Sequence, residues 1–157
     1  MKQAVFDMEF NTLDLDKVST IWCIVIQDVE TEEVFKYGPD KIDEAIKKLD
    51  SYDRIIGHNI ISADLPVLAK LKGYKPRGQV IDTLILSRLS NPDRAMPWGM
   101  PGPWHPHAID AWGYRLGRSK VKWDKWDEWD EGMLNRCEQD VLINTAVYKA
   151  LYHEFKE

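Results

Sequence analysis

Val5-Phe6-Asp7-Met8-Glu9-Phe10 is the stretch that decides the fold, because two acidic residues interrupt an otherwise apolar run. The run predicts a buried β-strand, and successive side chains of a strand lie on opposite faces of the sheet. Asp7 and Glu9 therefore share one face. Desolvated carboxylates side by side repel each other unless a cation or a hydrogen-bond network compensates their charge. We expect a divalent ion there, because Mg²⁺ and Mn²⁺ prefer hard carboxylate oxygens.

Four further strands are expected around this one. Residues 20–29 and 33–37 are rich in β-branched and aromatic residues and are joined by short polar links, which predicts an antiparallel meander of three strands. Residues 54–57 and 80–83 are short strands, each followed by a helical pattern, which adds strands parallel to the first. The sequence thus predicts an α/β fold with a mixed five-stranded sheet flanked by helices.

Helical spacing of apolar residues marks the covering elements. Residues 40–49 form the first helix, with Asp40 at its N-cap position, and Asp82 is expected to cap a later one. Four more helices are expected at residues 62–71, 84–89, 107–116 and 134–155. Residues 91–106 contain five prolines and two glycines, which predicts a surface loop.

The composition fits one domain covering residues 1–157, of which 44% are hydrophobic. We expect no membrane span, because no apolar run of about 18 residues occurs. The chain enters its first strand without a secretory signal pattern, so we expect a cytoplasmic protein. Cys23 and Cys137 are expected to be reduced core residues.

The net charge of −5 counts against a protein that holds nucleic acid on a broad basic surface. It counts less against a metal nuclease, which gathers carboxylates at its site and needs only a local basic patch. Two groups of cations qualify, with solvated surface side chains as the equally weighted alternative. They are Lys70, Lys72, Lys75 and Arg77, and Arg115, Arg118, Lys120 and Lys122.

Two more acidic residues stand near the ends of elements. Asp64 follows His58-Asn59 at the start of a helix, and Asp140 lies in the last helix, whose other face is apolar. Taken alone, Asp64 is explained by the helix dipole and Asp140 by exposure to solvent. The order of the acidic motifs along the chain favours a shared site over these separate explanations. The motifs are Asp-x-Glu on the first strand, Asn then Asp after the fourth, and Gln-Asp on the last helix.

This ordered set resembles the DEDD superfamily of exonucleases, which is named after its four acidic residues. Further segments are similar to the proofreading exonuclease domain of phage-type family A DNA polymerases, and together they cover almost the whole chain. The matching strings are Asp7-Met8-Glu9-Phe10-Asn11-Thr12-Leu13, His58-Asn59, Ile81-Asp82-Thr83-Leu84-Ile85-Leu86-Ser87-Arg88-Leu89 and His107-Ala108-Ile109-Asp110-Ala111-Trp112-Gly113-Tyr114-Arg115-Leu116-Gly117. The resemblance implies a ribonuclease H-like fold.

The resemblance also implies a metal-dependent 3′-to-5′ exonuclease that releases nucleoside monophosphates from the 3′ end of single-stranded DNA, in proofreading. Two divalent ions, Mg²⁺ or Mn²⁺, would activate a water and stabilise the developing charge. Their implied ligands, which form the catalytic set, are Asp7, Glu9, Asp64 and Asp140. The implied substrate contacts are Phe10, Asn11, Leu13, His58, Asn59 and Arg136. For Phe10 and Leu13, core packing is the alternative.

The expected partners are a DNA 3′ end and a DNA polymerase acting in trans, in a host cytoplasm if the chain is phage-encoded. Two other functions stay open. One is a catalytically weak or inactive module that binds nucleic acid or a polymerase. The other is an exoribonuclease that trims RNA, because no residue pattern here distinguishes RNA from DNA.

The chain departs from the family at Arg136. Family members carry a tyrosine four residues before the last aspartate or a histidine five before it, and these positions hold Arg136 and Asn135. Arginine stays protonated, so it cannot act as a base, and its spacing suits a pair with Asp140. Alternatively it turns to a phosphate, or another residue such as His107 or Tyr114 supplies the missing function, or the enzyme is slow or inactive.

Two further features modify the expected pocket. Ala63 stands where the family usually has an aromatic residue before the second-element aspartate, which predicts a looser substrate pocket. Acidic residues separate three tryptophans, and they would repel a phosphate backbone, which favours a lid or packing segment over base stacking. The three are Trp123, Trp126 and Trp129.

Overall fold

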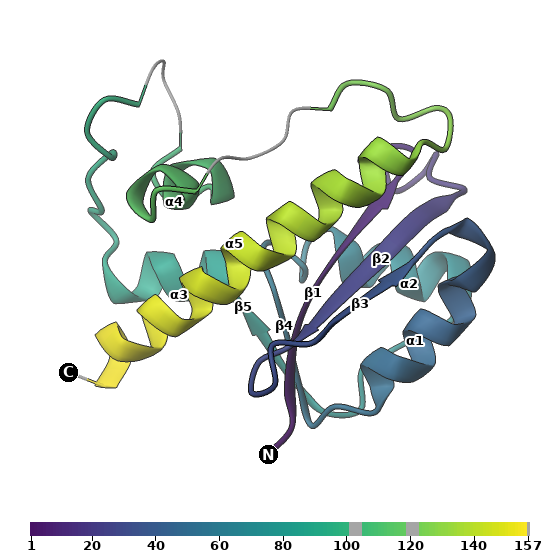
Figure 1. The fold of residues 1–157 in the computed structure, drawn as a ribbon, viewed down its shortest axis with the longest axis horizontal. Coiled ribbons are helices and arrows are strands. Elements are labelled where there is room, and N and C mark those ends of the chain that lie inside the picture. The colour runs from purple at the N-terminus through teal and green to yellow at the C-terminus, as the bar shows by residue number, and fades with distance from the viewer. Residues whose placement is uncertain (101–104, 119–122, 157) are drawn as a thin grey trace.

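A computed structural model describes residues 1–100, 105–118 and 123–156. It shows one sheet with helices on both faces (Figure 1). The strands are β1 (Gln3–Phe10), β2 (Ile21–Asp28), β3 (Val34–Tyr37), β4 (Arg54–Gly57) and β5 (Gln79–Asp82). The helices are the 3-10 turn η1 (Pro39–Lys41), α1 (Ile42–Asp50), α2 (Asp64–Lys72), α3 (Thr83–Ser90), α4 (Ile109–Arg115) and α5 (Glu131–Lys156). Part of the proline-rich segment, together with Lys120 and Lys122, lies outside the described residues.

The sheet has the order β3-β2-β1-β4-β5, so β1 is its central strand. β1 pairs antiparallel with β2, and β2 pairs antiparallel with β3. On the other side, β1 pairs parallel with β4, which in turn pairs parallel with β5. This confirms the predicted mixed sheet of three antiparallel strands followed by parallel ones, which is the ribonuclease H-like arrangement.

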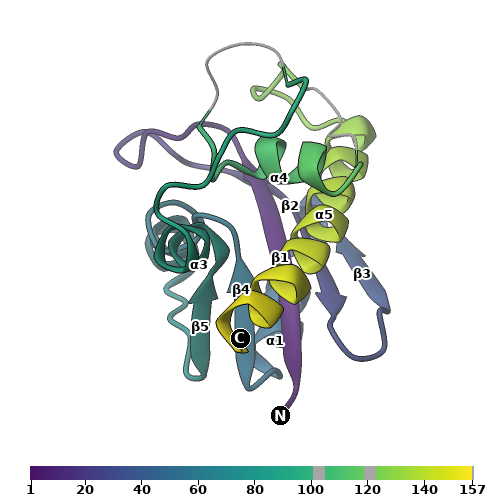
Figure 2. The same cartoon turned by 90° about the vertical axis from the view of Figure 1, so that its left-hand side faces the viewer.

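Alternation along β1 separates two of the three hydrophobic clusters of the described residues. Ala4, Phe6 and Met8 face α1 and α2 in one cluster, whereas Val5 packs against α5 in the other. Asp7 and Glu9 follow the parity of Val5 and therefore lie on the α5 side. α5 crosses this face diagonally (Figure 1), and α3 and α4 pack against it (Figure 2).

Two predicted helix starts are wrong. Asp40 is not the cap of α1, because Pro39 begins a 3-10 turn there and α1 starts only after Lys41, which makes no side-chain capping bond. The last helix starts three residues earlier than predicted, because the Asp130 side chain accepts a hydrogen bond of 2.7 Å from the Gly132 N–H.

Cys23 and Cys137 are both free and buried, as predicted. Residues 91–100 form no regular helix or strand, which agrees with the predicted loop over the part that is described. Among the described residues, no helix is long and apolar enough to cross a membrane.

We predict that Gly57→Ala lowers the free energy of unfolding by about 1 to 3 kcal/mol, because the added methyl would overlap Ile60 and lie 3.2 Å from the Phe6 carbonyl oxygen. Gly38→Ala is the matched control, since the nearest atom to its new Cβ is Trp129 Cζ2 at 3.7 Å. It should change stability by less than about 0.5 kcal/mol. Urea unfolding of both variants measures the difference, and equal midpoints would contradict the close packing at the end of β4.

Candidate active site

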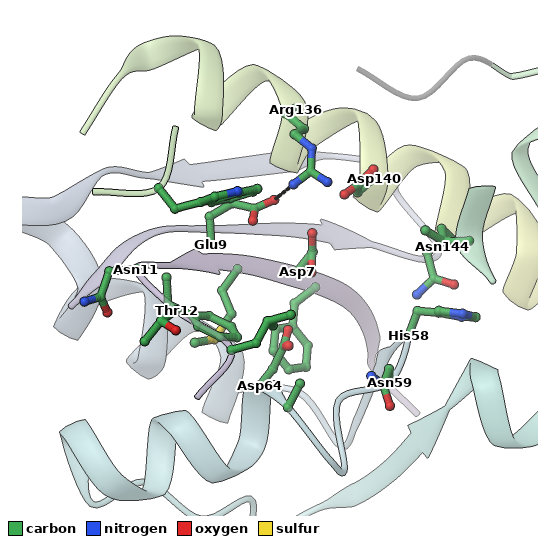
Figure 3. Close-up of a pocket in the computed structure, with 17 residues that line it drawn as sticks. Asp7, Glu9, Asn11, Thr12, His58, Asn59, Asp64, Arg136, Asp140 and Asn144 are labelled. Carbon is green, nitrogen blue, oxygen red and sulfur yellow. Dashed lines mark hydrogen bonds and ion pairs between the residues drawn. The ribbon is translucent and has the colours of Figure 1, made fainter. Parts of the chain in front are cut away.

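One pocket of about 600 Å³ opens at the end of β1 (Figure 3). It is lined by residues from β1, from the turn after β4, from the start of α2 and from α5. All ten predicted site residues line it: Asp7, Glu9, Phe10, Asn11, Leu13, His58, Asn59, Asp64, Arg136 and Asp140. The fold therefore brings together residues that are up to 133 positions apart in the sequence, from Asp7 to Asp140.

The acidic side chains are crowded and largely withdrawn from water. Glu9, Asp64 and Asp140 are 7%, 5% and 8% exposed. Burial, followed by the charge of Asp7, raises the pKa of Glu9, while the charge of Arg136 opposes this shift, and burial with Asp7 and Asp82 raises the pKa of Asp64 well above its usual range. Asp64 Oδ2 is buried and has no hydrogen-bond partner among the described residues. The ionised forms of these carboxyl groups are thus unfavourable without a partner of opposite charge, and a bound cation would stabilise them.

The donor atoms at the base of the pocket suit a hard divalent ion. Carboxylate oxygens of Asp7 and Glu9 lie within 4.8 Å of each other and of Cys137 Sγ. Burial raises the pKa of the Cys137 thiol, which donates to Asp7 Oδ2 at 3.8 Å. A protonated thiol is a poor ligand for Mg²⁺, whereas carboxylate oxygens are good ones. The residues present therefore fit a divalent ion held by carboxylates.

Arg136 points into this acidic pocket from α5. Its Nη1 lies 3.0 Å from Glu9 Oε1, and its guanidinium stacks 4.9 Å from the ring centre of Trp126. This ion pair joins α5 to β1. The four-residue spacing between Arg136 and Asp140 had suggested only a pair within α5. Neither suggested substitute for the missing tyrosine lines the pocket. His107 is buried with its Nδ1 2.6 Å from Ser87 Oγ, and Tyr114 is half exposed.

Asp82 holds the turn that carries Asn59 and leads to Asp64. Its carboxylate accepts the backbone N–H groups of Asn59 at 2.8 Å and of Ile61 at 3.1 Å. It also accepts the N–H of Leu84 at 3.0 Å, which confirms the predicted cap of α3. Asn59 has a φ of 61°, a left-handed conformation that asparagine tolerates better than most residues. Asp82, which the sequence predicted only as a helix cap, therefore also holds the turn after β4 in place.

A polar chain closes the inner end of the pocket. Thr83 Oγ1 lies 2.9 Å from His58 Nδ1 and 2.8 Å from Asn144 Oδ1. Asn144 lies one helical turn after Asp140, is 3% exposed and lines the pocket. Trp126 forms part of the opposite wall, and its carbonyl accepts a 2.8 Å bond from Trp22 Nε1. The tryptophan segment thus packs against the site, as predicted for at least this residue.

The remaining predicted contacts differ in exposure. Leu13 is 88% exposed at the rim, so core packing does not explain it, whereas Phe10 belongs to the core below the pocket. Asn11 accepts the N–H groups of Ser19 and Thr20 through Oδ1 and closes the base of the loop after β1. Its side chain is therefore committed at least in part to the fold.

The two basic groups are mostly committed to contacts within the protein. In the first, Lys72 pairs with Asp43 and Arg77 with Asp50, while Lys70 donates to backbone carbonyls. In the second, Arg115 stacks on a tryptophan and donates to a carbonyl. Among the described members of the two groups, these four cations therefore contact the protein itself.

The amino-acid sequence is similar to that of known phage DNA polymerases. The DNA-directed DNA polymerase of Escherichia phage T7 is 34% identical to the chain over 138 residues, in a match that covers 76% of the chain. This similarity confirms the predicted resemblance to phage-type DNA polymerases. It spans only a fifth of the phage polymerase's length. No protein-family model matches it.

Solved structures of other proteins share the fold. Brucella melitensis NrnC with bound Mg²⁺ superposes with a TM-score of 0.68 at 19% identity, over 98% of this chain and 73% of that one. Escherichia coli RNase D, an exoribonuclease, gives a TM-score of 0.62 at 20% identity, over 98% of this chain and 40% of that one. At these identities the likeness concerns the fold alone.

We predict that Asp82→Ala lowers the free energy of unfolding by about 2 to 4 kcal/mol, because three backbone N–H groups lose their acceptor. Asp82→Asn, which keeps one carbonyl oxygen but offers an amide to the Ile61 N–H, should lose less. Urea unfolding gives both values. A loss below about 0.5 kcal/mol for Asp82→Ala would show that the turn holds without this carboxylate.

Proposed function

We propose that the chain is a metal-dependent 3′-to-5′ exonuclease that hydrolyses the terminal phosphodiester bond of single-stranded DNA. The observation that carries the proposal is that four carboxylates, most of them buried, line one pocket. Their mutual repulsion makes the metal-free pocket unfavourable and a cation-filled one favourable. The relationship to a phage DNA polymerase supports DNA as the substrate and a proofreading role beside a polymerase.

Asp7, Glu9, Asp64 and Asp140 would hold two divalent ions, Mg²⁺ or Mn²⁺. Such ions supply an activated water near neutral pH and stabilise charge on the leaving 3′ oxygen. The chain's own residues position the strand. Leu13, at the exposed rim, would contact the last bases, while Phe10, His58 and Asn59 would line the place of the terminal nucleotide, with Asn11 beside them.

Arg136 supplies an electrostatic contribution in place of proton transfer. A guanidinium stays protonated at physiological pH, so it cannot accept the proton of an attacking water. It can neutralise a phosphate oxygen, because its fork of N–H groups matches that geometry. We therefore propose that hydrolysis proceeds without the family's tyrosine or histidine and that Arg136 binds the phosphate.

We predict that a 5′-labelled single-stranded DNA oligonucleotide is shortened stepwise from its 3′ end with Mg²⁺ or Mn²⁺ and stays intact with EDTA. Asp7→Ala should lower the rate at least about a hundredfold, because it removes a ligand from the charged site. Asp93→Ala, an exposed aspartate outside the pocket-lining set, is the matched control. Strand binding without cleavage would favour the binding module, and faster shortening of the RNA version would favour an exoribonuclease.

We predict that Leu13→Ala lowers kcat/KM on the same oligonucleotide about tenfold, because a leucine that packs against the strand loses buried apolar area. Its stability should change by less than about 0.5 kcal/mol, since the side chain is 88% exposed. Leu89→Ala on α3, 66% exposed and absent from the pocket lining, serves as the control. Equal kcat/KM values for both variants would remove Leu13 from the strand-binding set.

A further inference from the structure

Arg136 and Glu9 form a buried ion pair inside the proposed catalytic pocket. The two side chains are 15% and 9% exposed, and Nη1 lies 3.0 Å from Oε1. An ion pair shielded from water in this way interacts more strongly than a surface pair. Glu9 is also one of the four proposed metal ligands, so the same carboxylate has two candidate cations.

The guanidinium is held in place on its second side. Its Cζ lies 4.9 Å from the ring centre of Trp126, a stacking distance for a planar cation. Trp126 is itself fixed, because its carbonyl oxygen accepts a 2.8 Å hydrogen bond from Trp22 on β2. The arginine therefore sits in a built position between β1 and the segment before α5, and is not a surface side chain that folds in by chance.

A charge count shows what this cation does to the pocket. Four carboxylates carry four negative charges, which two divalent ions would cancel. Arg136 then leaves a single positive charge, which matches the single negative charge of one phosphodiester. Without a divalent ion, the same guanidinium lies 3.0 Å from Glu9 Oε1 and balances the charge of this carboxylate.

We propose that Arg136 is an exchangeable counter-ion of Glu9, which neutralises this carboxylate in the metal-free pocket and passes to the phosphate of the bound strand. The inference rests on the proposed function for the identity of the strand. A divalent ion and the guanidinium compete for one carboxylate oxygen, so Arg136 weakens metal binding in the free protein. Once displaced, it strengthens strand binding, and metal and strand therefore bind cooperatively.

Titration with Mn²⁺ alone, without nucleic acid, tests the competition by calorimetry. Arg136→Gln and Arg136→Tyr, which both lack the charge, should bind Mn²⁺ at least about fivefold more tightly than the wild-type protein. Arg136→Lys keeps a charge and should show a smaller change. Arg77→Gln is the matched control, because Arg77 is exposed and pairs with Asp50 outside the pocket.

A second measurement should show the opposite change in affinity, this time for the nucleic-acid strand. Binding of a labelled single-stranded DNA oligonucleotide in Ca²⁺, followed by fluorescence anisotropy, should weaken at least about fivefold in Arg136→Gln and Arg136→Tyr. A residue that only supports the fold would not tighten one ligand and loosen the other. Circular dichroism checks that each variant is folded, and the two uncharged variants provide independent tests.

The outcomes separate this inference from the proposed function. Unchanged or weaker Mn²⁺ binding in both uncharged variants would overturn the counter-ion exchange, even if the wild-type protein binds Mn²⁺ and shortens the oligonucleotide. Absence of Mn²⁺ binding in every variant would overturn both proposals. Tighter Mn²⁺ binding with weaker oligonucleotide binding in the uncharged variants would support the exchange.

Discussion

Repulsion between buried carboxylates on the central strand is the constraint on which the rest of the structure depends. Asp7 and Glu9 share the α5 face of β1, the central strand of the five. Burial in that position makes their negative charge costly unless a cation lies nearby. α5 meets this need in part by bringing Arg136 to Glu9, and it also brings Asp140 to the same pocket.

The turn after β4 provides the third side of the pocket at a structural cost of its own. It must place Asp64 near Asp7, although the charge of Asp82 also lies close enough to raise the pKa of Asp64. Asp82 offsets this repulsion by fixing three N–H groups of the surrounding backbone. The Asp82 carboxylate thus adds negative charge near Asp64, and at the same time it makes the turn rigid.

Regular periodicity made the fold and the shared face of Asp7 and Glu9 predictable, whereas Asp64 and Asp140 were implied by the resemblance to exonucleases. The alternation around Asp7 and Glu9 depends on local strand geometry, and the parallel strands follow from strand-then-helix order. The pairing of Arg136 with Glu9 could not be read in this way, because spacing rules describe neighbours on one helix and this pair spans 127 residues. The hydrogen bonds from Asp82 to the turn after β4 could not be predicted for the same reason, since the backbone N–H groups that donate to it come together only in the folded chain.

The distribution of charge bears on how such a protein would hold a strand. Its net charge is −5, and most of the described cations of the two basic groups bond to the protein's own acids and carbonyls. These described cations are then less available to follow a long phosphate backbone, which is the usual source of length-dependent, salt-sensitive affinity. Attraction would instead be concentrated at the pocket, where cations can bind. A pocket can accept the end of a strand more readily than its middle, so this concentration of charge favours action on termini.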